Sequence, residues 1–452
     1  MVAEESEREG ALSQPEEPIA KRTCTPADAR VEDKASLLEV CAEVAPSHPP
    51  DVGGEAEAVG NAFGGAKGTK RKVALFMAYL GIGYSGMQRN PGVETIEEDL
   101  EKAIVKAGGI SEANAGDFTK VNWSRAARTD KGVSAVGQVV ACKMVIDPPG
   151  LVDRINSHLP EQIRVLGYVR TTGGFSAKNL CDRRRYEYVL PTFAFDKRVG
   201  RPKEDFGLGE ECTKEELDEA KRTEEVAVKD SPFVFDYSHR SRLNNILRVY
   251  VGTKNHHNFT IRMAASDPSA QRHILSFVCS EPFEVNGKQF VRLQVTGQSF
   301  MLHQIRKMVG AALAVMRDVA AETGFENAFS NQHKLNTPMA PELGLFLDEA
   351  IFNAYNERYG ETHENVSCAD YQDQIDAFKK THIYPHIANT EETENTCRNW
   401  LRGLTLQNYP FTTEPVVEGL TKGKRNREDQ RKGSGREERE TVTRVSQTVK
   451  SE

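Results

Sequence analysis

The spacing of hydrophobic and polar residues predicts alternating strands and helices from about residue 71 onward. Nearly continuous apolar runs, typical of buried strands, occur in VALFMAYL, GQVVACKMVI, IRVLGYVR, RYEYVLPTFAF and LGLFLDEAIF. Apolar residues at helical spacing occur in TIEEDLEKAIVKAG, LVDRINSHLP, SRLNNILRVYVG and MLHQIRKMVGAALAVMRDVA. Thr95 is the expected N-cap of the first helix.

A tight turn in the second half indicates the fold class. Asn286-Gly287 lies between the strand-like runs RHILSFVCSEPFEV and QFVRLQVTGQSF, and this dipeptide favours a two-residue hairpin. Because strands outnumber crossover helices and neighbours are joined by such a turn, we predict an α+β fold with a mostly antiparallel central sheet.

Domain boundaries follow from the segments without this periodicity. Residues 1–70 and 416–452 are predicted to be disordered tails, the first acidic and the second charged. Residues 196–238 are predicted to be a polar insertion with a surface helix in TKEELDEAKRTEEVAVK. The two α/β halves of the domain are then expected at 71–195 and 239–415.

Charge and cysteine content narrow the class of protein. The net charge is −7, and residues 1–70 alone hold 7 Lys/Arg against 14 Asp/Glu, so 7 − 14 = −7 accounts for the whole surplus. Any basic surface must therefore be local. The eight cysteines include no C-x-x-C pair, which disfavours a zinc site or a disulfide framework. No apolar run approaches the ~20 residues of a membrane span.

The stretch GIGYSG, residues 81–86, spells the dinucleotide-binding pattern G-x-G-x-x-G. In that motif the third glycine opens a helix, whereas MQRNPGVET follows here. We therefore expect no nucleotide cofactor, and predict a glycine-rich turn that lets the backbone pass close to a ligand or a strand.

The segment ARTDKGVSA, residues 127–135, admits two interpretations. Thr-Asp-Lys-Gly is typical of a type I turn, so Asp130 can simply be the corner of a loop. Arg125, Arg128 and Lys131 crowd this carboxylate, however, and neighbouring cations favour its ionised form. An ionised carboxylate suits a nucleophile or a base.

Two later segments also carry candidate chemistry. In DRRRYEYVL, Arg183–Arg185 precede two tyrosines that share one face of the predicted strand. This arrangement suits phosphate binding and base stacking. It is also typical of an edge strand whose two tyrosines lie in the core. In the helix that follows QSFML, His303 and Arg306 lie off the apolar stripe. If Arg306 is buried, its guanidinium needs an acidic partner, and Asp130 is the candidate. If Arg306 is exposed, it needs no such partner.

These segments, in this order, resemble the TruA-type pseudouridine synthases, and most closely the eukaryotic multisite tRNA pseudouridine synthase branch. The resemblance spans about residues 71–360 and is weaker near HIYPHIANTEE. Lys131 and Lys178 stand where bacterial members usually carry alanine and arginine, which fits the eukaryotic branch. The resemblance implies the pseudouridine synthase fold, in which two α/β halves share the sheet and RNA lies in the cleft between them.

The resemblance also implies a reaction and its residues. The enzyme would flip uridines out of tRNA and isomerise them to pseudouridine, with snRNA and mRNA as further candidate substrates. It would act as a monomer and need no metal or cofactor. Asp130 would be catalytic, either as nucleophile or by removing the C2′ proton. Around it, Tyr186 would stack on the base, Arg128 would steady the RNA, Arg306 would pair with Asp130, and Leu345 would line the pocket.

Alternatives stay open on function and location. A catalytically inactive RNA-binding protein of the same fold is the second hypothesis. The basic stretch KGKRNR, residues 422–427, permits nuclear import, with the cytoplasm as the alternative. The acidic start MVAEESEREG disfavours import into mitochondria.

Overall fold

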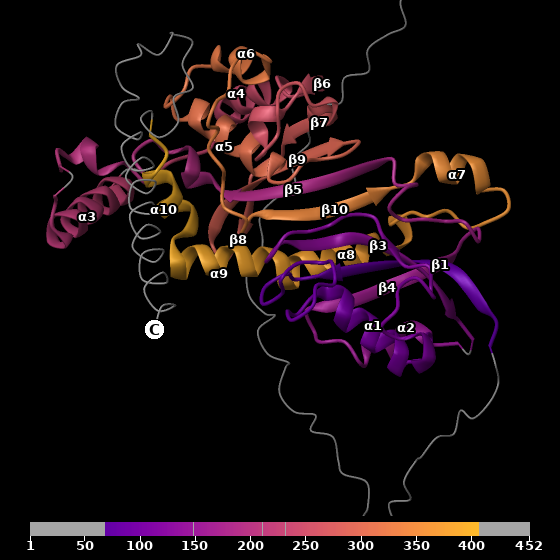
Figure 1. Ribbon diagram of the computed structural model, residues 1–452. Coiled ribbons are helices and arrows are strands. Elements are labelled where there is room, and N and C mark those ends of the chain that lie inside the picture. The colour runs from indigo at the N-terminus through magenta and orange to yellow at the C-terminus, as the bar shows by residue number, and fades with distance from the viewer. Residues whose placement is uncertain (1–67, 148, 210, 231, 406–452) are drawn as a thin grey trace, which may run out of the picture. The chain divides into compact units, whose positions relative to one another are not determined.

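The computed structural model describes residues 68–147, 149–209, 211–230 and 232–405. Strands in these ranges form one ten-stranded sheet in the order β4-β1-β3-β10-β5-β9-β7-β6, with β2 beside β3 and β8 beside β9 (Figure 1). Their bounds are Lys70–Tyr79 (β1), Ser124–Arg125 (β2), Ser134–Val145 (β3), Ile163–Arg170 (β4), Arg183–Pro191 (β5), Gly252–Asn255 (β6), Gln271–Cys279 (β7), Phe283–Val285 (β8), Lys288–Gly297 (β9) and Leu345–Ile351 (β10). Only β3 and β10 pair in parallel among the described strands, so the predicted α+β fold with a mostly antiparallel sheet is confirmed.

Helices cover both faces of this sheet. Their bounds are Ile96–Lys106 (α1), Leu151–Asn156 (α2), Lys214–Asp230 (α3), Tyr237–Arg248 (α4), Gln304–Met316 (α5), Gly324–Phe329 (α6), Asn353–Tyr359 (α7), Gln372–Phe378 (α8), Tyr384–Glu394 (α9) and Thr396–Arg402 (α10). Alternate residues of a strand point to opposite faces. Val73, Leu75 and Met77 accordingly pack in one core with α1, α2, α4 and α5, whereas Phe76 packs with α8 and α9 on the other face. None of the described helices is both long and apolar enough to cross a membrane.

Most predicted elements are confirmed, with shifted ends. The helix α4 begins before the predicted Ser241 because the Asp236 carboxylate accepts a hydrogen bond from the His239 backbone N–H at 3.0 Å and caps the first turn. Thr95 precedes α1 as predicted, although its side chain makes no capping hydrogen bond. The helix α5 begins only after His303, whose left-handed φ of 62° breaks the helical geometry.

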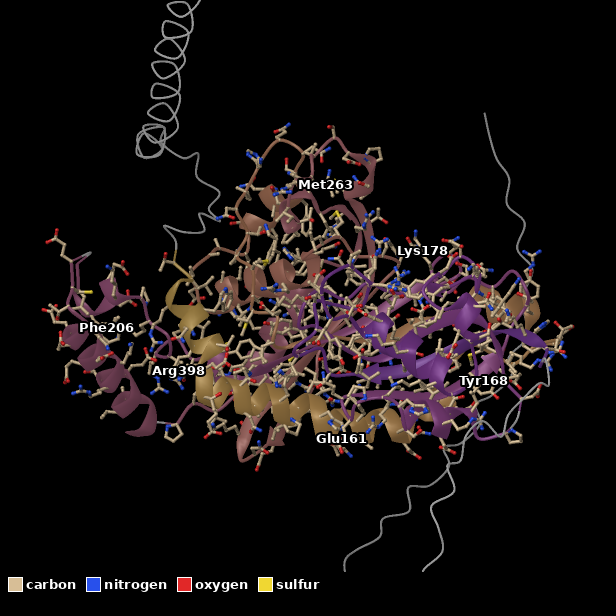
Figure 2. All side chains as sticks on the ribbon, turned by 60° about the horizontal axis from the view of Figure 1, so that its bottom comes forward. Glu161, Tyr168, Lys178, Phe206, Met263 and Arg398 are labelled. Carbon is tan, nitrogen blue, oxygen red and sulfur yellow. The ribbon has the colours of Figure 1, made fainter. Side chains whose placement is uncertain are left out.

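The polar insertion contains the predicted helix, which is α3. Glu224 of α3 is buried and accepts a hydrogen bond from the Gly200 N–H at 2.9 Å, and it pairs with Arg398 of α10 at 3.4 Å. Figure 2 labels Arg398 on α10 and Phe206 on the insertion. The predicted tails, residues 1–70 and 416–452, lie outside the described residues except for 68–70, where β1 begins.

Candidate active site

The R-T-D segment lies between β2 and β3 and presents Asp130 on an exposed turn. The Val133 N–H donates to the Asp130 carbonyl at 3.1 Å, which closes a turn over Lys131 and Gly132. Gly132 has a φ of 75°, the left-handed value that the third position of a type II turn requires. The predicted turn is therefore confirmed, but it begins at Asp130 and is not type I.

Buried side chains hold the backbone that leads to Asp130. The Thr129 hydroxyl is hydrogen-bonded to the Tyr79 hydroxyl at 2.8 Å. The buried amide of Gln138 accepts from the Ala127 N–H at 3.1 Å and donates to the Ala127 carbonyl at 2.9 Å. Because these partners sit in the strands β1 and β3, the turn is fixed to the sheet.

The glycine-rich stretch at residues 81–86 packs directly against this turn. The Met87 N–H donates to the Thr129 carbonyl at 3.2 Å, and the Gly132 N–H donates to the Tyr84 carbonyl at 3.3 Å. A Cβ on Gly86 would lie 2.7 Å from the Thr129 carbonyl oxygen, and one on Gly81 would lie 2.5 Å from the Val133 carbonyl oxygen. The predicted role for these glycines, close passage of backbone past another segment, is confirmed.

Asp130 opens into a cavity of about 480 Å³, a volume within the range of small-molecule pockets. Tyr186 of β5 and Leu345 of β10 line it from two neighbouring strands of the sheet. The remaining lining residues come from the R-T-D turn and from the segment that enters α5: Arg128, Thr129, Val133, Phe300, Met301, Leu302, His303, Gln304 and Ile305. Asp130 is the one carboxylate among these described lining residues.

The environment of Tyr186 and His303, two residues that line the cavity with Asp130, favours the neutral form of each side chain. Burial raises the pKa of Tyr186 to about 12, so its hydroxyl stays protonated at neutral pH. Burial and the nearby Arg306 guanidinium lower the pKa of His303 and favour the neutral imidazole, although Asp130 acts in the opposite direction. His303 Nδ1 is buried without a hydrogen-bond partner among the described residues. The Tyr186 ring meets Phe300 edge to face, with 5.3 Å between the ring centroids.

The expected pair between Arg306 and Asp130 does not form within the described part of the chain. Arg306 Nε donates to the Ala340 carbonyl at 2.7 Å, and its Nη2 lies 2.8 Å from Glu342 Oε2. The Ala340 N–H in turn donates to the Arg306 carbonyl at 3.1 Å. These bonds tie Arg306 to the segment before β10.

Arg125, one of the cations predicted to crowd Asp130, has a different acidic partner. Arg125 donates from Nε to the buried carboxylate of Glu97.

The three arginines of β5 differ in their surroundings. Arg185 pairs with Asp348 and Arg184 donates to backbone carbonyls, whereas Arg183 is exposed. Lys178, on the segment before β5, is exposed too (Figure 2). Since β5 lies between β10 and β9, the prediction of an edge strand is wrong, whereas the predicted core position of its two tyrosines is confirmed.

Tyr186 and Tyr188 share one face of β5, as predicted, but differ in their surroundings. Tyr186 lines the cavity, whereas the Tyr188 hydroxyl donates to the Pro341 carbonyl at 2.7 Å. Sequence patterns did not identify Gln138 or Phe300 as parts of the site. Gln138 is a polar residue within an apolar strand run, and that is the signal that could have marked it.

Comparisons with known proteins show which family the chain belongs to. Residues 246–353 match the family model described as tRNA pseudouridine synthase. The Pseudouridylate synthase 1 homolog of Mus musculus is 42% identical over 349 residues, covering 76% of each chain. The tRNA pseudouridine synthase 1 of Yarrowia lipolytica is 38% identical over 383 residues, covering 72% of each chain. The chain belongs to the TruA-type tRNA pseudouridine synthase family.

Membership in this family makes the chain an RNA uridine isomerase. The Homo sapiens Pseudouridylate synthase 1 homolog is also 42% identical, over 346 residues covering 75% of this chain and 74% of the relative. The family match ends just after β10, whereas these longer similarities also span the sequence that contains the R-T-D turn.

Proposed function

We propose that this pseudouridine synthase acts on tRNA and uses Asp130 as its catalytic carboxylate. The observation that carries the assignment is the cavity itself, which has Asp130 as its one described acidic lining residue. The turn that presents Asp130 is held to the sheet through Thr129 and Ala127, so the carboxylate has a fixed approach to the cavity. Such pre-positioning is what lets one group replace a bimolecular encounter.

The surrounding side chains suit a flipped uracil. Tyr186 offers a ring to the cavity, Phe300 forms a T-shaped pair with that ring, and Leu345 adds an apolar lining residue. Arg128 lines the rim and is exposed, where it can contact the RNA backbone or fill the gap left by the base. Flipping a base costs a few kcal/mol, and phosphate contacts by such cations offset that cost.

The chemistry needs a carboxylate close to C1′ of the flipped nucleotide. The N1–C1′ bond breaks, the uracil turns, a C5–C1′ bond forms, C5 loses its proton and N1 gains one. Asp130 can attack as a nucleophile, or it can remove the C2′ proton so that a glycal forms. Burial raises the pKa of Tyr186 to about 12, which makes its phenol a still weaker acid than an exposed tyrosine. We assign it a stacking role because it lines the same cavity as Asp130.

Arg306 acts indirectly in this proposal. It lies at the start of α5, which supplies one cavity wall, and it fixes that wall to the segment before β10 through Ala340 and Glu342. We therefore propose that Arg306 positions the cavity in the free enzyme.

Site-resolved pseudouridine mapping on tRNA transcripts tests the proposal. The purified wild-type protein is expected to convert particular uridines, and Asp130→Asn is expected to bind the same transcripts without converting them. Undiminished product from Asp130→Asn would refute the assignment. The second hypothesis, an inactive RNA-binding protein, predicts binding without product from the wild type as well.

We propose further that the enzyme is a nuclear monomer and that snRNA and mRNA are additional substrates. These proposals rest on the likeness to the eukaryotic branch and on KGKRNR at residues 422–427, which lies outside the described residues. Transcriptome-wide mapping with and without the gene tests the substrates. A fluorescent fusion with and without residues 422–427 tests the location, and sedimentation tests the oligomeric state.

A further inference from the structure

Arg184 joins the separate walls of the candidate active site. Its Nε and Nη2 donate to the Ala126 carbonyl at 3.0 and 2.7 Å, and its Nη1 donates to the Gln298 carbonyl at 2.9 Å. Both acceptors are backbone atoms, and Arg184 has no ion pair within the described residues. The guanidinium therefore acts as a bridge between two chain segments.

Each bridged segment leads directly into the cavity. Ala126 precedes Arg128 and Asp130 on the R-T-D turn, and Gln298 precedes Phe300, the first of the lining residues on the α5 side. Arg184 itself lies on β5, the strand that carries Tyr186. Arg184 thus links the strand of the stacking ring to both segments, in addition to the bonds through Thr129 and Gln138 that hold the R-T-D turn to the sheet.

The neighbouring arginines of the same strand do not share this arrangement. Arg183 is exposed, and Arg185 points to the other face of the sheet, where it pairs with Asp348 and, at 2.8 Å, with Glu349. The planar fork of a guanidinium can reach two carbonyls in a fixed geometry, which the single ammonium of lysine cannot reproduce. The bridge is therefore specific to Arg184 and to its side-chain type.

We infer that Arg184 is a positioning residue for uridine isomerisation, acting by holding the R-T-D turn in register with Tyr186 and the entrance of α5. The inference rests on the proposed function. It implies that loss of the bridge lowers kcat more than it weakens RNA binding, because misplacement of a reacting group by about 1 Å costs about 100-fold in rate.

A matched control is available elsewhere in the chain. Arg317 donates to the carbonyls of Ala194, Asp196 and Val199 at 3.0, 2.6 and 2.6 Å, so it too joins backbone segments. It is buried and lies outside the cavity lining. Arg317→Lys removes the same kind of contact without touching the site.

The experiment compares wild type, Arg184→Lys and Arg317→Lys in single-turnover pseudouridine formation at saturating tRNA, with tRNA affinity and the thermal unfolding midpoint measured alongside. We expect Arg184→Lys to react about 100-fold more slowly per folded molecule, with affinity within about threefold of wild type. We expect Arg317→Lys to unfold at a lower temperature but to react at the wild-type rate.

An unchanged rate in folded Arg184→Lys would overturn the inference, as would an equal loss of rate in Arg317→Lys. Hydrogen exchange gives a second readout: amides of residues 127–134 should exchange faster in Arg184→Lys and not in Arg317→Lys. If Arg184→Lys fails to fold, Arg184→Gln is measured in the same way. A wild-type protein without activity on any tRNA would instead refute the proposed function.

Discussion

Replacing Gly86 by alanine should displace the catalytic turn. Gly86 has a φ of 100°, and a Cβ there would lie 2.7 Å from the Thr129 carbonyl oxygen and 3.3 Å from the Asp130 carbonyl carbon. Real Cβ atoms essentially never come within 3.0 Å of another heavy atom, and neither obstacle is a flexible side chain. The backbones at Gly86 and Thr129 must therefore separate, and we expect this separation to displace the turn that carries Asp130.

Gly83 of the same loop separates strain from displacement. It also has a positive φ, 83°, but a Cβ there would meet no atom within 4 Å. Both alanine variants therefore incur the left-handed backbone strain of about 1–2 kcal/mol, whereas only Gly86→Ala pushes on the turn. We expect Gly83→Ala to lose about that amount of stability in urea titrations, and Gly86→Ala to lose more because the clash adds to the strain.

Only Gly86→Ala should also lose activity, by about 100-fold in the single-turnover rate, because a shift of about 1 Å at a reacting group has that effect. Pseudouridine formation is measured at saturating tRNA, so that altered affinity does not contribute. The reasoning is refuted if Gly86→Ala reacts at the wild-type rate, or if Gly83→Ala slows as much.

Two further predictions concern stability. Lys379 Nζ lies 2.5 Å from Asp348 and 3.1 Å from Glu187, two buried carboxylates. Lys379→Met should therefore lower the free energy of unfolding in urea by about 3–5 kcal/mol. Lys380 is exposed, so Lys380→Met is the control, and an equal loss in both variants would contradict this prediction. Burial lowers the pKa of His256 from 6.5 to about 4. The unfolded chain therefore binds a proton that the folded chain does not between these pH values, so stability is full above pH 6.5 and falls by up to about 3 kcal/mol toward pH 4. In His256→Phe this part of the acid-induced loss should disappear, and an unchanged slope would show that His256 is not its source.

Periodicity was sufficient for the longer strands and for α1, α4 and α5, because apolar residues repeat along each of them, but it did not predict the short strands β2 and β6. It failed for α8 and α9. Their buried residues Ile375, Phe378, Ile383 and Ile387 are separated by three, five and four positions, since a turn of π-helix at Lys379–Ile383 inserts an extra residue. The apolar stripe is continuous in space but irregular in the sequence.

The candidate site was predictable in its residue types but not in its contacts. Asp130, Tyr186 and Leu345 do meet at one cavity, as the family resemblance implied. Arg306 and the β5 arginines, by contrast, take partners that depend on where β10 and α5 lie, which no local pattern specifies. A long cationic side chain reaches several acceptors, so only the fold decides among them.

The central claim is that Asp130 performs the isomerisation. Its most direct test is the single-turnover rate of pseudouridine formation by Asp130→Asn at saturating tRNA, beside the affinity of the same variant. We expect wild-type affinity and a rate lower by about 10²–10⁴-fold or more, since an amide can serve neither as nucleophile nor as base. A variant that binds tRNA and reacts at the wild-type rate would contradict the claim.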